Sequence, residues 1–165
     1  MYKYEEKELE LIDPTNPILH QECEDVLPEE FEDVKKLGEK MISFCAEKGG
    51  LGLAASQIGI NKKMFIWMNG SDSFQIIINP RYHKSDKKTS NLIEGCLSYP
   101  DKNFFVVRHK YINAIFDVYN EREKKFKKVY RKLSGEKAYV FQHETDHVYG
   151  ITLEKSGEEF NLEDE

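Results

Sequence analysis

Apolar residues recur at helical spacing near the N-terminus of the chain. Positions 31, 34, 37, 41, 42 and 45 are apolar, and most of them follow one another three or four residues apart. This spacing is typical of an amphipathic helix. Pro28 and the two glutamates after it fit the first turn of such a helix, and Gly49-Gly50 fit its end. The pattern therefore predicts one N-terminal amphipathic helix whose apolar stripe lies in the core.

Short apolar runs of strand length follow. Residues 64–68 and 74–78 are separated by Asn69-Gly70, a turn signal, and residues 104–107, 111–119 and 126–133 predict further strands. Residues 81–91 are polar and basic and predict a loop. A second helix is predicted over 135–149, with Ser134 as its N-cap and Gly150 at its end. Strands with two long helices indicate an α+β domain.

Composition excludes several classes of protein. The chain has 165 residues, which suits one domain, and its 20 aromatic residues can form a core. It has neither an apolar run long enough to cross a membrane nor the basic-then-apolar start of a signal peptide. Its three cysteines, an odd number, form no disulfide framework. We therefore expect the cytoplasm or an equivalent reducing compartment where translation occurs.

Charge is segregated along the chain. Residues 1–33 carry a net charge of −10, residues 154–165 carry −5, and the residues between them carry +9. The last stretch is acidic and has few apolar residues, so we expect residues 1–153 to form a single domain and residues 154–165 a disordered tail. The basic middle is either a solvated surface or a face that meets a polyanion.

The residues most informative about chemistry are in FQHETDHVYG. His143 and His147 lie four residues apart, so on a helix they occupy one face, and Glu144 lies close to that face. In the HExxH pattern two imidazoles bind a divalent metal and the carboxylate moves a proton on an adjacent water. The alternative is a coincidental pair of surface histidines.

Two imidazoles need a third protein ligand, because catalytic zinc-type sites have three. Cys96 is the best candidate, since it lies in the irregular segment EGCLSYP rather than on an apolar stripe. A lone cysteine is more often a buried core residue, and Cys23 and Cys45 fit that description.

Three separated segments resemble the three motifs of the peptide deformylase family. GLGLAASQIG at 50–59 is similar to the family's GxGLAAxQ motif, EGCLS at 94–98 to its second motif, and QHETDH at 142–147 to its third. Their order also matches, and the resemblance covers roughly residues 10–152. HExxH alone is shared by many metallohydrolases, whereas the three motifs together are specific.

The resemblance implies a fold, a cofactor and an activity. The fold would be antiparallel β-sheets wrapped around a central HExxH helix. The cofactor would be one divalent metal ion held by Cys96, His143 and His147, usually Fe(II), with Ni, Co or Zn able to replace it. The activity would be the removal of the formyl group from the N-terminal formylmethionine of newly made proteins.

The resemblance also implies roles for individual residues. Glu144 would transfer the proton, and the Gln57 side chain with the backbone N–H of Leu97 would stabilise the oxyanion. The substrate-binding residues would be Gly50, Leu51, Gly52, Leu92, Glu94, Gly95, Tyr139 and Val140.

Partners and rival functions follow from the same reading. We expect formyl-methionyl nascent peptides as substrates, a transient ribosome contact through the basic strands from Lys124 to Lys132, a monomer, and no membrane or DNA partner. One alternative is an HExxH zinc peptidase. The other is a catalytically inactive deformylase-like binding protein, which a missing Glu, Cys or Gln in the motifs would signal; Glu144, Cys96 and Gln57 are all present.

Overall fold

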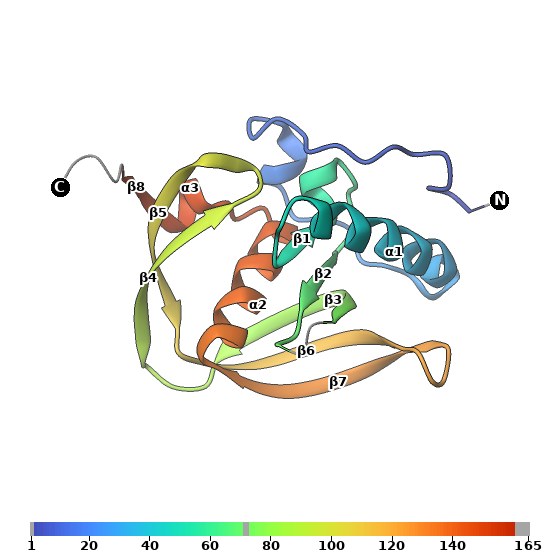
Figure 1. The fold of residues 1–165 in the computed structure, drawn as a ribbon. Coiled ribbons are helices and arrows are strands. Elements are labelled where there is room, and N and C mark those ends of the chain that lie inside the picture. The colour runs from blue at the N-terminus through green and yellow to red at the C-terminus, as the bar shows by residue number, and fades with distance from the viewer. Residues whose placement is uncertain (1, 71–72, 161–165) are drawn as a thin grey trace.

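Antiparallel strands surround one central helix in the computed structural model, which describes residues 2–70 and 73–160 (Figure 1). The helices are α1 (Phe31–Glu47), α2 (Gly135–Val148), α3 (Leu153–Ser156) and the short 3₁₀ turns η1 (Pro17–His20), η2 (Pro28–Glu30) and η3 (Ala55–Ile58). The strands are β1 (Gly52–Ala54), β2 (Met64–Met68), β3 (Phe74–Lys84), β4 (Thr89–Cys96), β5 (Tyr99–His109), β6 (Tyr111–Asn120), β7 (Lys125–Ser134) and β8 (Gly157–Phe160).

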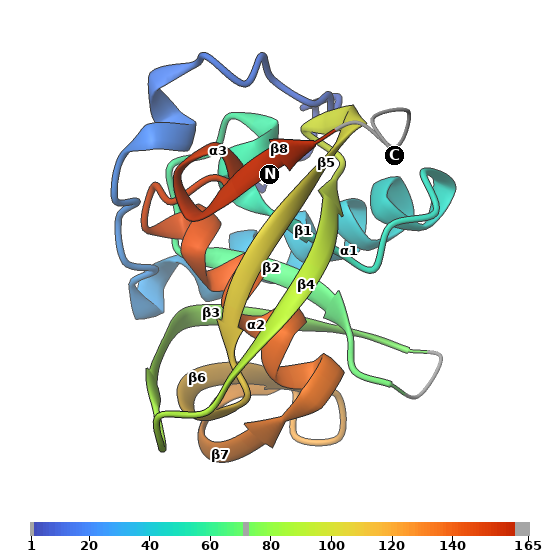
Figure 2. The same cartoon turned by 90° about the vertical axis from the view of Figure 1, so that its left-hand side faces the viewer.

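The strands form two sheets, and α2 lies between them (Figure 2). One sheet has the order β1-β2-β3-β6-β7 and the other has the order β4-β5-β8, with every neighbouring pair antiparallel. Phe141 of α2 contacts the rings of Phe65, Trp67 and Phe116 in the five-stranded sheet. The predicted α+β fold with antiparallel sheets around the HExxH helix is confirmed.

The N-terminal amphipathic helix is also confirmed. Its predicted stripe points inward, because Val34, Leu37, Met41 and Cys45 are buried in a cluster with apolar residues of β2 and β3. The prolyl turn before it is the 3₁₀ turn η2 rather than part of α1. The second predicted helix is α2, with extended Ser134 as its N-cap and no side-chain capping hydrogen bond from it.

The predicted loop over 81–91 is wrong. β3 continues to Lys84 and β4 begins at Thr89, which leaves only a short connection between the two strands. Polar residues are tolerated in both strands because every second side chain points outward: Asn91 of β4 is exposed, whereas Leu92 faces Val106 of β5. Backbone pairing with β6 and β5 makes these residues strands, although the local sequence does not predict it.

The predicted disorder of the tail is wrong for residues 154–160. They complete α3 and form β8, which pairs with β5 from Asn103↔Phe160 to Val106↔Gly157. Phe160 stacks on Phe105 with 4.0 Å between ring centroids. Lys102 also pairs with Glu159 at 3.3 Å, so backbone pairing, an aromatic stack and an ion pair hold this acidic segment on β5. Residues 161–165 lie outside the described part of the chain.

None of the described helices combines the length and the apolar character that a membrane crossing requires.

Candidate metal centre and active site

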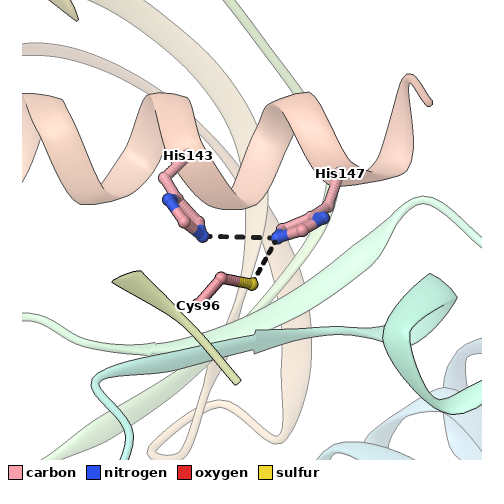
Figure 3. A group of neighbouring side chains, drawn as sticks. All are labelled: Cys96, His143 and His147. Atoms are coloured by element: carbon pink, nitrogen blue, oxygen red, sulfur yellow. Dashed lines mark hydrogen bonds between the residues drawn. The ribbon is translucent and has the colours of Figure 1, made fainter. Parts of the chain in front are cut away.

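Helix α2 and the end of β4 bring the three predicted ligands together (Figure 3). His143 and His147 lie one turn apart on α2, and their Nε2 atoms are 3.3 Å from each other. The Sγ atom of Cys96 is 3.3 Å from Nε2 of His147. One ligand atom from each residue therefore lies within 4.8 Å of the other two.

The electrostatics of this trio favour a thiolate. Burial opposes ionisation of Cys96, but the two imidazoles outweigh it and hold the pKa of the thiol well below its usual range. Burial opposes the charged form of His143 and lowers its pKa. Hydrogen bonds to Cys96 and Glu94, with the charge of Glu144, outweigh burial and raise the pKa to about 10. One thiolate and two imidazoles fit a divalent transition-metal ion, and this donor set does not select one metal among several.

Glu144 lies beside the ligands with an unused oxygen. The side chain is buried, burial raises the pKa of its carboxyl, and Oε2 has no hydrogen-bond partner among the described residues. The backbone of β1 packs directly on this carboxylate, because a Cβ placed on Gly52 would lie 2.7 Å from Oε1 of Glu144. Glycine at this position therefore makes room for a carboxylate that is available to take up a proton.

Gln57 is held in one orientation at the end of the GLAASQ segment. Its Oε1 accepts a hydrogen bond from the backbone N–H of Ala54 at 2.9 Å. Its Nε2 donates to Oγ of Ser98 at 2.9 Å and to Sγ of Cys96 at 3.3 Å. The amide NH₂ therefore faces the ligand cluster. Ser98 was not among the predicted site residues. Its position as the last residue of the EGCLS motif was the signal that could have identified it.

A buried ion-pair network lies behind His143. Glu94 accepts a hydrogen bond from Nδ1 of His143 at 2.8 Å and two more from the fork of Arg108, both at 2.9 Å. Burial raises the pKa of the Glu94 carboxyl, but these bonds outweigh it and lower the pKa to about 2. Arg108 also donates to Asp146 at 2.7 Å, and Asp146 accepts from Tyr82 at 2.6 Å. The network fixes the His143 ring so that Nε2 faces Cys96 and His147.

Arg108 was missed in the sequence, and Glu94 was assigned to the substrate. A signal was present, because alternation along β5 turns Phe104, Val106 and Arg108 inward together. A cation on an otherwise apolar face requires buried anions. The carboxylate of Glu94 is occupied by Arg108 and His143, so it positions the histidine, although Glu94 also lines the cavity.

A cavity of about 330 Å³ opens onto the site. It is lined by Leu51, Gly52, Gln57, Leu92, Ile93, Glu94, Gly95, Cys96, Tyr139, Val140, His143 and Glu144. Of the predicted residues, Gly50, Leu97 and His147 are not in this lining; Gly50 packs between Cys45 and the Leu97 side chain. Ile93 was not predicted, and Tyr139 shares a 2.7 Å hydrogen bond with Ser90.

Comparison with known proteins decides the family. A family model described as Polypeptide deformylase matches residues 9–158. The chain belongs to the polypeptide deformylase family. The peptide deformylase of Thermotoga sp. strain RQ2 is 34% identical over 139 residues, which cover 84% of this chain and 80% of that protein.

Solved deformylase structures have the same fold. The crystal structure of peptide deformylase from Thermotoga maritima matches with a TM-score of 0.78 and 30% identity, over 90% of this chain and 96% of that one. A probable peptide deformylase from Synechococcus phage S-SSM7 matches with a TM-score of 0.78 and 31% identity, over 90% and 99%. Deformylases are enzymes that remove the formyl group from newly made peptides, and these relatives support that activity here; they favour neither the zinc peptidase nor the inactive binding protein.

Proposed function

We propose that the chain performs this deformylation in the cavity beside Cys96, His143 and His147, with one divalent metal ion held by these three residues. The observation that carries the proposal is the convergence of the three ligand atoms within 4.8 Å beside Glu144, whose Oε2 has no hydrogen-bond partner among the described residues. We propose Fe(II) as the resident ion, with Ni, Co or Zn as substitutes. When bound, the ion supplies Lewis-acid activation of water and of the formyl oxygen.

Glu144 moves the proton in this scheme. Its free oxygen accepts a proton from the attacking water and then delivers it to the departing amine. Burial raises the pKa of the carboxyl, and this makes it a better base than an exposed glutamate. The Gln57 NH₂ exchanges its longer hydrogen bond, to Sγ of Cys96, for one to the oxygen of the formyl group as negative charge develops there, and Leu97 donates its backbone N–H to the same oxygen. One such donor is worth about 3–4 kcal/mol of barrier.

The cavity provides the place for the peptide. Leu51, Leu92, Tyr139 and Val140 supply apolar surface for the methionine side chain. β4 lies at an open edge of its sheet, so its backbone can pair with an extended peptide in the manner of strand addition. Gly95 lines the cavity and leaves space for that backbone, whereas Gly50 packs outside the lining and Gly52 leaves space for the Glu144 carboxylate.

The wider assignment follows from the substrate. We propose that the protein acts as a monomer on formyl-methionyl nascent peptides in the cytoplasm or an equivalent reducing translation compartment, with no membrane or DNA partner. A transient ribosome contact through the basic strands belongs to this proposal. Residues 1–153 carry the catalytic machinery, since the three motifs end by Gly150.

The decisive experiment is formate release from formyl-Met-Ala-Ser. Protein purified anaerobically with iron should release formate stoichiometrically with free amine. Glu144→Gln is the matched control, because it keeps the shape of the side chain and removes the base. Cleavage of internal peptide bonds without formate would favour the peptidase, and metal-loaded protein that releases nothing would favour the binding protein.

A further inference from the structure

Eight exposed cations gather at one end of the molecule and none of them lines the cavity. They come from residues 81–88, 110–115 and 128–134, where Asp86 is the one acid. Within the described part of the chain, none of the eight has a carboxylate at salt-bridge distance, in contrast to the lysines of the β6–β7 turn. This basic end consists of Arg81, Lys84, Lys87, Lys88, Lys110, Lys128, Arg131 and Lys132.

Strand pairing holds the three stretches together. His83 of β3 lies opposite Asn113 of β6, which lies opposite Lys132 of β7. The backbone N–H of Lys110 donates to the carbonyl of Lys88 at 2.9 Å, so the turn between β3 and β4 is fixed against the start of β6. Figure 2 shows this turn, the end of β7 and the start of α2 together at the lower end of the molecule. The cations therefore sit on a rigid framework.

Two exposed tyrosines lie on the outer face of β6 and β7, the face that Arg81, Lys128 and Lys132 share. The register places Lys84 and Arg131 on the opposite face, beside Ile112 and Ala114. Tyr130 is 70% exposed and lies between Lys128 and Lys132 on one face of β7. Tyr111 is 38% exposed on the same face of β6, and Nζ of Lys88 lies 5.8 Å from its ring centroid. This face points away from α2, because the intervening residues of β6, such as Ala114, are buried against that helix.

We propose that the basic end binds single-stranded RNA. Its cations suit phosphates, and its tyrosine rings suit unpaired bases, which stack on exposed aromatic side chains of a sheet. Half-buried Asp117, opposite Lys128, is the single acid on this face of β6 and β7, so the surface repels a polyanion weakly. The choice of RNA over DNA rests on the proposed function, since newly made proteins emerge from an RNA-based machine.

The basic stretch from Lys124 to Lys132 has two parts, which differ in whether carboxylates lie close to their lysines. At the β6–β7 turn, Lys124 pairs with Glu121, and Lys125 and Lys127 pair with Glu123. Two carboxylates therefore offset most of the charge of these three lysines. Lys128 and Lys132, on the face that carries Tyr130, have no carboxylate at salt-bridge distance among the described residues.

The test is the binding of a short labelled single-stranded RNA of mixed sequence, measured by fluorescence anisotropy. Log affinity should fall linearly with log salt between about 50 and 200 mM, with a slope of about −0.7 for each phosphate neutralised. Tyr130→Ala should weaken binding by about 5- to 150-fold, whereas Tyr130→Phe keeps the ring and should bind like the wild type. Lys128→Glu with Lys132→Glu should abolish binding.

Controls separate RNA recognition from plain charge attraction. Lys36→Glu in α1 with Lys48→Glu at its C-cap makes the same charge change elsewhere and should change affinity far less. Heparin has charge but no bases, so its binding should be insensitive to Tyr130→Ala. The proposal would be overturned if Tyr130→Ala lost as much affinity for heparin as for RNA, or if it bound RNA like the wild type. Tighter binding of the same DNA sequence or of phosphatidylserine vesicles than of RNA would also overturn it.

The deformylase activity of the same variants is measured separately, as formate release. All of these variants should release formate at the wild-type rate, because the substituted residues do not line the cavity. RNA binding needs neither metal nor formyl peptide, so a failure of the proposed deformylation would leave the RNA result standing, and the reverse also holds.

Discussion

Replacing Arg108 by methionine should destabilise the whole protein. The side chain is 4% exposed and makes three charge-assisted hydrogen bonds, two with Glu94 at 2.9 Å and one with Asp146 at 2.7 Å. Methionine fills a similar volume, so the main loss is the cation between two buried carboxylates. Removing one partner of a buried ion pair costs about 3–5 kcal/mol. At about 2–4 °C per kcal/mol for a chain of this size, the melting temperature should fall by about 6–20 °C.

The assay is thermal unfolding followed by circular dichroism, at equal metal content. Arg122→Met, in the exposed β6–β7 turn, is the matched control and should change the free energy of unfolding by less than about 0.5 kcal/mol. At acid pH the wild type and Arg108→Met should differ less in their free energy of unfolding. The folded pKa of Glu94 is lowered to about 2, so its stabilisation is full above the unfolded pKa of about 4.5 and is lost as the pH falls towards 2. A loss below about 1 kcal/mol at neutral pH would refute the network as a source of stability.

Five further variants test the site and the fold. Cys96→Ser should lose most of its metal, measured by elemental analysis, since a neutral hydroxyl replaces a thiolate; retention at wild-type affinity would mean that another residue is the ligand. Glu144→Gln should keep metal and fold but release formate about 10²–10⁴ times more slowly. Gly52→Ala should also slow formate release while binding metal, because its Cβ would displace the carboxylate 2.7 Å away. Truncation after Glu154 should lower the melting temperature, because it removes β8; Phe160→Ala should reproduce part of that loss, and an unchanged melting temperature would contradict the role of β8.

The sequence anticipates the parts of the fold that local patterns encode. The stripe on α1 and the HExxH spacing are periodic within one helix, so both could be located before any tertiary structure was known. β4 and β8 are different, because their strand conformation depends on backbone pairing with β5. The candidate site divides in the same way. Residues such as Cys96 can be identified from a short sequence motif. Arg108 cannot, because its partners lie 14 and 38 positions away in the sequence.

The three cysteines differ in the chemistry available to them. Burial raises the pKa of Cys23 and of Cys45 to about 11, whereas the thiol of Cys96 is held towards its anion. Only the thiolate attacks alkylating reagents or peroxides, so a native chain without metal should take up one equivalent of iodoacetamide, and at Cys96. A bound ion would shield that sulfur. The same asymmetry makes Cys96 the first place where air oxidation would damage the protein, and an intact thiol count becomes a direct measure of how much of a preparation can still hold its metal.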